Sequence, residues 1–187
     1  MPGTGGFVRP AREADAASLA RVQVASWRRG YAGIVPEALL ASLTGEEAEA
    51  AWRDRWREAI TNPPTSKHRV LVAVERAKGS APRPVVGFVS VGPATDADRW
   101  PGTDGDIYEL RVAPERAGYG HDSRLMQAAI DTLAEDGFRT ASMWVLAADP
   151  ALREFLESAG WAADGARGEL DVGTSVPVLR LHTAIGG

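Results

Sequence analysis

The stretch DIYELRVAPERAGYGHDSRLMQAAIDTLAED, residues 106–136, decides the fold. Residues 106–112 alternate with the two-residue period of a β-strand, which places Asp106 on one face and Glu109 on the other. A short loop with two glycines follows. Apolar residues then recur at helical spacing: Leu125, Met126, Ala129, Ile130 and Leu133. The stretch therefore predicts a strand, a tight loop and a helix.

A glycine loop between a strand and a helix is a potential anion site. The first-turn N–H groups of a helix have no partner within it, and the helix dipole adds positive potential there. Gly118 and Gly120 lie just before the predicted helix, and Gly137 closes it. The loop alone is a weak indicator of function, so the rest of the chain has to support it.

Further strands and helices surround this unit. Strands are expected at residues 7–9, 68–75, 84–91, 140–146, 169–172 and 176–182. Helices are expected at residues 15–29, 37–43, 45–61 and 150–159. A loop longer than a tight hairpin turn is expected over residues 76–83. The order of strands and helices predicts the α+β class, with parallel and antiparallel pairs in one sheet.

Length and composition are those of an ordinary globular protein. The 187 residues suit one domain, residues 1–187, behind a flexible lead of residues 1–6. A net charge of −4 without a basic run argues against a nucleic-acid partner. The chain has no cysteine, and its three histidines are scattered, so no metal site is expected. No apolar run approaches a membrane span and no signal peptide is visible, so a cytoplasmic protein without a membrane partner is expected.

Four segments resemble the GNAT N-acetyltransferase superfamily. They are Val112-x-Pro114 before the loop, Leu125-Met126 after it, Ala25-Ser26-Trp27-x-x-x-Tyr31-x-Gly33, and Asp149-Pro150-x-x-x-x-Phe155-Leu156-x-x-x-Gly160-Trp161. The resemblance covers about residues 7–183. It implies a mixed sheet of six to seven strands flanked by about four helices. It also implies that the central parallel strands, residues 107–112 and 141–146, splay apart and hold acyl-CoA in the opening.

The resemblance implies a set of residues that bind the cofactor, acetyl-CoA or another acyl-CoA. The strand edge that contacts pantetheine would be Leu110, Arg111 and Val112. The diphosphate loop would be Ala117, Gly118, Tyr119, Gly120, His121, Asp122, Ser123 and Arg124, and Asp149 would contribute from beyond the next strand. The loop departs from the family, which has Gln or Arg at the position of Ala117 and Gly or Ala at the position of Asp122; only Gly120 fits.

Asp122 is open to two interpretations. Its carboxylate could point at the diphosphate and repel it, or it could cap the helix and take the anion's place against the first-turn N–H groups. Arg116 and Arg124 could still reach a phosphate, or they could be solvated surface residues.

Acyl transfer to an amine requires that an ammonium group lose a proton. Asp106 is the first candidate base, since it lies at the strand position where a carboxylate base sits in some members of the family. The alternative is a structural Asp at the start of a strand, and Glu109 is the second choice of base. The family's oxyanion donor would be a backbone N–H in residues 110–112. Leu156 stands where the family usually has the Tyr that protonates the leaving thiolate.

The leading hypothesis is therefore an acyl-CoA-dependent N-acyltransferase acting on a small amine or amino-acid-like acceptor. The alternative is a catalytically degenerate GNAT-fold module that binds a partner and binds acetyl-CoA weakly or not at all. The sequence leaves the oligomeric state open, a homodimer included.

Overall fold

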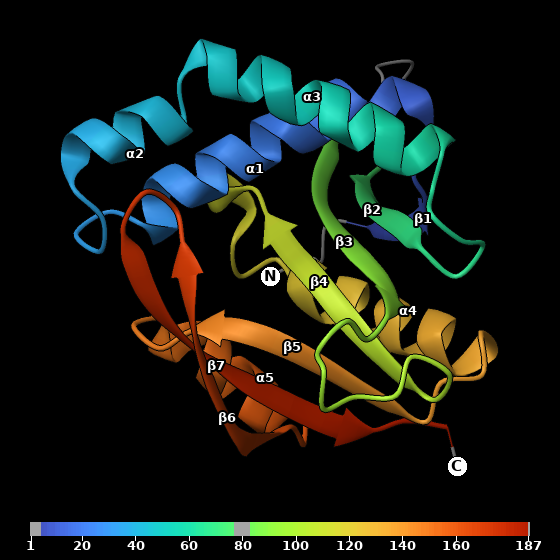
Figure 1. The fold of residues 1–187 in the computed structure, drawn as a ribbon. Coiled ribbons are helices and arrows are strands. Elements are labelled where there is room, and N and C mark those ends of the chain that lie inside the picture. Colours follow the sequence, from blue (N-terminus) through green and yellow to red (C-terminus); the bar gives the residue numbers. More distant parts are fainter. Residues whose placement is uncertain (1–4, 77–82, 187) are drawn as a thin grey trace.

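One seven-stranded mixed sheet organises this computed structural model, which describes residues 5–76 and 83–186 (Figure 1). The strand order is β1-β2-β3-β4-β5-β7-β6. The strands are β1 (Gly6–Pro10), β2 (Arg69–Glu75), β3 (Val85–Pro93), β4 (Asp104–Val112), β5 (Thr140–Leu146), β6 (Ala162–Asp171) and β7 (Ser175–Ala184). Within these residues only β4 and β5 pair in parallel, and the other neighbouring pairs are antiparallel. The expected α+β sheet is confirmed.

In the described part of the chain, five α-helices cover the two faces of the sheet, where the resemblance implied about four (Figure 1). They are α1 (Ala16–Gly30), α2 (Glu37–Leu43), α3 (Glu46–Thr61), α4 (His121–Glu135) and α5 (Pro150–Ser158), with two 3-10 turns, Glu13–Asp15 and Pro114–Arg116. Helices α1 and α3 pack on one face, where Trp56 and Phe88 lie in the core. Helices α4 and α5 pack on the other, around Leu125, Leu133 and Leu156.

The two central strands separate along their length. They pair only from Asp104 with Thr140 to Asp106 with Ser142, although both strands continue well beyond this point. Hydroxyl groups of β5 join the paired ends, because Thr140 donates to Asp104 over 2.7 Å and Ser142 donates to Asp106 over 2.5 Å. Beyond these bonds the strands diverge (Figure 1). The splay that the family resemblance implied is present.

The structure describes the start of the chain and the connection between β2 and β3 only in part. The lead of residues 1–6 is too long, because Gly6 already pairs with Glu75 in the sheet and the Gly5 carbonyl accepts a bond from Arg76. Residues 1–4 lie outside the described part. The same holds for residues 77–82, so the expected loop at residues 76–83 is not tested, although β2 and β3 form the antiparallel pair that it would join.

Close pairing of β3 with β4 requires a glycine opposite the last residue of β4. Gly87 pairs with Val112, and a Cβ atom there would lie 2.8 Å from the Arg111 carbonyl oxygen and 3.0 Å from a Leu125 methyl group. The first contact is with backbone, which cannot rotate away. The absence of a side chain at Gly87 therefore sets how closely these two strands approach.

Gly87→Ala is expected to lower the free energy of unfolding by about 1–3 kcal/mol, the usual range for overpacking. Gly30→Ala is the matched control, because Gly30 ends α1 and a Cβ atom added there would have no described neighbour within 4 Å. It should be neutral or stabilise the protein by up to about 1 kcal/mol. Urea denaturation measures both, and equal stability of Gly87→Ala and wild type would contradict this account of the packing.

Candidate active site

A β-bulge in β4 determines which side chains of this strand lie on each face of the sheet. Ser90 and Val91 of β3 pair with Glu109 and Ile107, which leaves Tyr108 without a partner on β3. One extra residue in a strand shifts the alternation of its side chains. Glu109 therefore turns to the face covered by α1, where Gln23 and Trp27 donate to it.

The alternation expected from the sequence is wrong beyond Tyr108. Ile107 and Leu110 are three residues apart, yet both are buried in the core beneath α4. Asp106 precedes the bulge and lies opposite Ile107 by strand alternation. Asp106 and Glu109 consequently share a face of the sheet, whereas the sequence pattern placed them on opposite faces.

The opening between β4 and β5 contains a cavity of about 420 Å³. Residues of α1, β4, β5, β6 and β7 line it together with the start of α5. Its aromatic residues are Trp27, Tyr31, Tyr108 and Trp144, and its charged residues are Glu109, Arg111, Asp149 and Glu169. Such a mixture of apolar walls and a few polar groups is typical of small-molecule sites.

Glu109 is held firmly by one of its two oxygen atoms. Its Oε1 accepts from Gln23 Nε2 at 2.6 Å, from Arg111 Nε at 2.9 Å and from Trp27 Nε1 at 3.3 Å. Among the described residues, no hydrogen bond to its Oε2 is present. The side chain is 17% exposed, so the carboxylate is oriented by the protein while one oxygen stays available to a ligand.

Asp106 lies at the closed end of the opening and is 6% exposed. It accepts from Ser142 Oγ at 2.5 Å and from the Thr95 N–H at 3.2 Å. Burial raises the pKa of the Asp106 carboxyl above its ordinary value, although these two hydrogen bonds act in the opposite direction. Asp106 does not line the cavity itself, so a bridging water would be needed to connect it with a ligand there.

A groove of about 310 Å³ continues from the cavity toward α4. It brings together five of the residues assigned to the cofactor from the sequence: Leu110, Arg111, Val112, Asp122 and Asp149. Arg111, Asp149 and Leu152 line both hollows. The Asp149 carboxylate accepts from the Leu152 N–H, so this residue also caps α5, as its position before Pro150 indicated.

The loop before α4 turns at two glycines in the left-handed region. Gly118 and Gly120 have φ angles of 80° and 78°, which glycine adopts without strain. Gly120 occupies the cap position of α4, so the interpretation of Asp122 as the cap is wrong, and Asp122 is the second residue of the helix. Its carboxylate borders the groove, and burial raises its pKa.

The other loop residues point away from the groove or bind within the loop. His121 is fully buried, with its Nε2 atom 3.2 Å from Glu75. Arg116 also lies 3.0 Å from Glu75, and Arg124 donates to the Tyr119 carbonyl oxygen over 3.2 Å. Ala117 precedes the two glycines, and Ser123 faces a different hollow beside α5. The groove therefore receives little positive charge from this loop.

Leu156 contributes no polar group to the site. It is completely buried in the core between the sheet and α5. Where the resemblance implied a Tyr, Leu156 therefore offers a packing side chain and no hydroxyl group.

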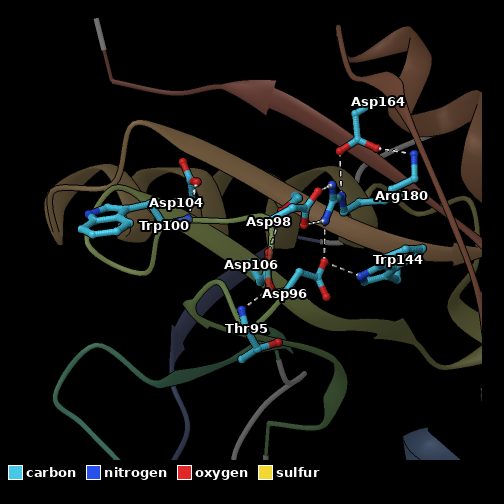
Figure 2. Close-up of polar contacts among 11 residues, drawn as sticks. Thr95, Asp96, Asp98, Trp100, Asp104, Asp106, Trp144, Asp164 and Arg180 are labelled. Carbon is cyan, nitrogen blue, oxygen red and sulfur yellow. Dashed lines mark hydrogen bonds and ion pairs between the residues drawn. The ribbon is translucent and has the colours of Figure 1, made fainter.

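A buried arginine fixes one wall of the cavity (Figure 2). Arg180 of β7 is 5% exposed and bonds three carboxylates: Asp96 at 2.7 Å, Asp98 at 2.6 Å and Asp164 at 2.6 Å. The ion pair with Arg180 lowers the pKa of Asp98 to about 2. These contacts hold the loop between β3 and β4 against β5, β6 and β7.

The same network orients Trp144. Its indole Nε1 donates to Asp96 over 2.9 Å, and the Arg180 guanidinium lies 5.5 Å from its ring centroid (Figure 2). On the β6 side, the ring lies next to Gly168. Trp144 is therefore a fixed wall of the cavity.

The sequence alone indicates a role in the site for few of the residues that line the cavity or fix its walls. In the sequence, Trp27 and Tyr31 belong to a segment that carries the family resemblance, and Trp144 falls within the strand expected at residues 140–146. Glu169 falls within the strand expected at residues 169–172, and nothing in the sequence singles out Asp96. Trp27 lies in α1, Tyr31 directly follows this helix, and Trp144 lies in β5. Only the tertiary structure brings the three rings together, so no local signal in the sequence could have found them.

The described residues contain no group of three or more His, Cys, Asp or Glu side chains arranged to hold a metal ion. Within the same part of the chain, no helix combines the length and the apolar character needed to cross a membrane.

A family model and a bacterial relative each match most of this chain. The model of the acetyltransferase (GNAT) family matches residues 26–161. The uncharacterized N-acetyltransferase YuaI of Bacillus subtilis strain 168 is 32% identical over 145 residues, which cover 78% of this chain and 74% of YuaI.

Solved structures share the fold. PaiA N-acetyltransferase of Thermoplasma acidophilum, in complex with coenzyme A, has a TM-score of 0.67 at 17% identity, covering 94% of this chain and 98% of that one. The acetyltransferase yncA of Salmonella typhimurium, with its cofactor acetyl-CoA, has a TM-score of 0.60 at 18% identity, covering 96% and 93%. Because the family model spans most of its length and YuaI covers more than two thirds of it, this chain belongs to the GNAT family of acetyltransferases.

Proposed function

We propose that this protein transfers an acetyl group from acetyl-CoA to the nitrogen of a small amine. The observation that carries the proposal is the continuity of the groove with the cavity at the separation of β4 and β5. A donor lying along the groove would present its thioester to the cavity. Family membership, and two structural relatives solved with coenzyme A or acetyl-CoA, support the choice of donor.

The free edge of β4 suits the pantetheine arm of the donor. Pairing with β5 ends at Asp106, so backbone groups of β4 beyond this residue that point away from β3 have no strand partner among the described residues. An N–H within residues 110–112 is the proposed donor to the thioester carbonyl oxygen as negative charge develops there. The diphosphate would then reach the first turn of α4.

The reaction needs a proton acceptor, and we assign this role to Asp106. An amine with a pKa near 10 is mostly protonated at neutral pH. The ammonium would pass one proton through a water molecule to the Asp106 carboxylate, and the freed nitrogen lone pair would attack the thioester carbon. The C–N bond then forms and the C–S bond breaks, while the second amine proton passes to solvent water, from which the departing thiolate is protonated. The raised pKa of Asp106 supports this role, because a base works best when its pKa lies near the working pH.

The leaving thiolate would take its proton from water. Leu156 offers no acid, and a thiol of pKa about 8.5 leaves as an anion at a cost of roughly 1–2 kcal/mol near neutral pH. This chain is therefore proposed to be a slower catalyst than relatives that have a Tyr there, but an active one.

The first test of the proposal is release of free thiol from acetyl-CoA in the presence of an amine panel. Asp106→Asn should lower kcat by roughly 100-fold or more, the usual contribution of a positioned base, and leave acetyl-CoA affinity nearly unchanged. Asp104→Asn is the matched control, because Asp104 also accepts from a β5 hydroxyl group but lies farther from the opening. It should keep wild-type turnover.

Unaltered turnover of Asp106→Asn between about pH 6 and 9 would remove Asp106 from the mechanism. Absence of thiol release with every amine, together with no thermal shift by acetyl-CoA, would favour the alternative of a degenerate binding module.

The departures in the diphosphate loop generate a second prediction. Asp122→Gly removes a negative charge from the groove, and Ala117→Arg adds a cation able to pair with a phosphate. Together they should tighten acetyl-CoA binding by about 2–4 kcal/mol, or roughly 30- to 1,000-fold. Calorimetric titration of wild type, both single variants and the double variant at one salt concentration measures the gain. Submicromolar binding by the wild type, or no gain in the double variant, would contradict the proposed position of the diphosphate.

The raised pKa of Asp122 adds a pH dependence. A carboxyl group with a raised pKa takes up its proton at a higher pH, so lowering the pH from about 8 to about 5 neutralises it earlier than an ordinary Asp. Repulsion of the diphosphate then weakens. The ratio of wild-type to Asp122→Asn dissociation constants for acetyl-CoA should fall toward one as the pH falls; a ratio that stays constant would show that Asp122 does not face the donor.

A further inference from the structure

We infer that the acceptor is a hydrophobic primary amine without a carboxylate group, bound with its ammonium on Glu109 and its apolar body against the aromatic walls of the cavity. This inference rests on the proposed acetyl transfer and narrows its acceptor. Three features of the cavity carry it: an oriented carboxylate with a free oxygen, an excess of negative charge, and apolar walls.

The oriented carboxylate is Glu109. Three donors converge on its Oε1 atom, from Gln23, Trp27 and Arg111, and fix the plane of the group. Within the described residues its Oε2 accepts no bond, and Glu109 borders the cavity. A carboxylate held in this way can accept one charge-assisted bond from an ammonium group without first breaking an internal contact.

The charges around the cavity favour a cation over a zwitterion. Among the described residues that line it, Glu109, Asp149 and Glu169 oppose a single guanidinium, that of Arg111. Arg111 is already committed through its Nε to Glu109 at 2.9 Å. A carboxylate on the acceptor would have to share this guanidinium and would be repelled by three carboxylates. An ammonium group would instead be attracted to these carboxylates and reduce the repulsion among them.

The walls favour an apolar body next to the ammonium group. Trp27 and Tyr31 meet edge to face, with ring centroids 5.3 Å apart, and Trp27 also donates to Glu109. Trp144 of β5 is held by Asp96 of the loop between β3 and β4 and by Arg180 of β7. Rings in these positions offer dispersion contacts to an apolar group and a favourable electrostatic surface to a nearby cation. A cavity of about 420 Å³ limits the acceptor to a small molecule.

The test compares 2-phenylethylamine with L-phenylalanine, which differs from it by one carboxylate group. With acetyl-CoA in excess, wild-type kcat/KM from thiol release should be at least about tenfold higher for the amine, since one unfavourably placed charge is worth a factor of that order. Binding is measured separately, by quenching of tryptophan fluorescence on titration of each compound in the presence of coenzyme A, because Trp27 and Trp144 border the cavity.

Two variants connect the effect to Glu109. Glu109→Gln keeps an oxygen for the internal donors and removes the charge, and it should weaken 2-phenylethylamine binding about tenfold or more, the usual effect of losing a hydrogen bond to a charged group. Glu154→Gln, an exposed change on α5 outside the cavity, is the matched control and should bind as wild type does.

The outcomes separate this inference from the proposed function. Thiol release with L-phenylalanine equal to or faster than with 2-phenylethylamine would overturn the inference and leave the acetyl transfer intact. Binding of 2-phenylethylamine that depends on Glu109, without thiol release, would support the site and contradict the proposed reaction. Binding by Glu109→Gln as tight as by wild type would overturn the assignment of Glu109.

Discussion

The end of the pairing between β4 and β5 at Asp106 and Ser142 is the constraint on which the rest of the site depends. A sheet that stayed paired beyond this point would leave no cavity and no groove. The two strands are tied at their paired ends by side-chain bonds, Thr140 to Asp104 and Ser142 to Asp106, and each then follows a different neighbour. Strand β4 stays with β3 as far as Val112, and β5 stays with β7 as far as Leu146. The opening is therefore built from ordinary pairing on both sides.

The β-bulge at Tyr108 determines that the Glu109 carboxylate borders this opening. Without it, Glu109 would point into the core beneath α4, where a charge would be costly. With it, Glu109 reaches α1 and borders the cavity, on the face where Asp106 also lies. The two carboxylates have different surroundings: Asp106 is buried and bonded through both oxygens, whereas Glu109 has one oxygen free within the described structure. These surroundings fit a proton acceptor and an ammonium-binding group, respectively.

The sequence predicts the elements of this fold better than the details of its site. Local periodicity correctly predicts the helix α4, the cap at Asp149 and most of the strands, because each depends on neighbours in the chain. The strand expected at residues 169–172 is too short, since β6 already begins at Ala162. The expectation that Asp106 and Glu109 lie on opposite faces of the sheet is wrong, because a β-bulge depends on how two strands pair and not on one strand alone. The cap at Asp122 is wrong because Gly120, with its positive φ angle, takes that position. The contacts of Arg180 with Asp96, Asp98 and Asp164 join segments far apart in the chain, which no single-sequence pattern records.

The central claim is that the acetyl donor lies where β4 and β5 separate, with its thioester in the cavity. A crystal structure of the protein with acetyl-CoA tests it most directly. The account predicts electron density for pantetheine along residues 110–112, the thioester next to the cavity bordered by Glu109 and Trp144, and the diphosphate near the first turn of α4. Density for the donor elsewhere on the molecule, with the opening between the two strands unoccupied, would contradict it.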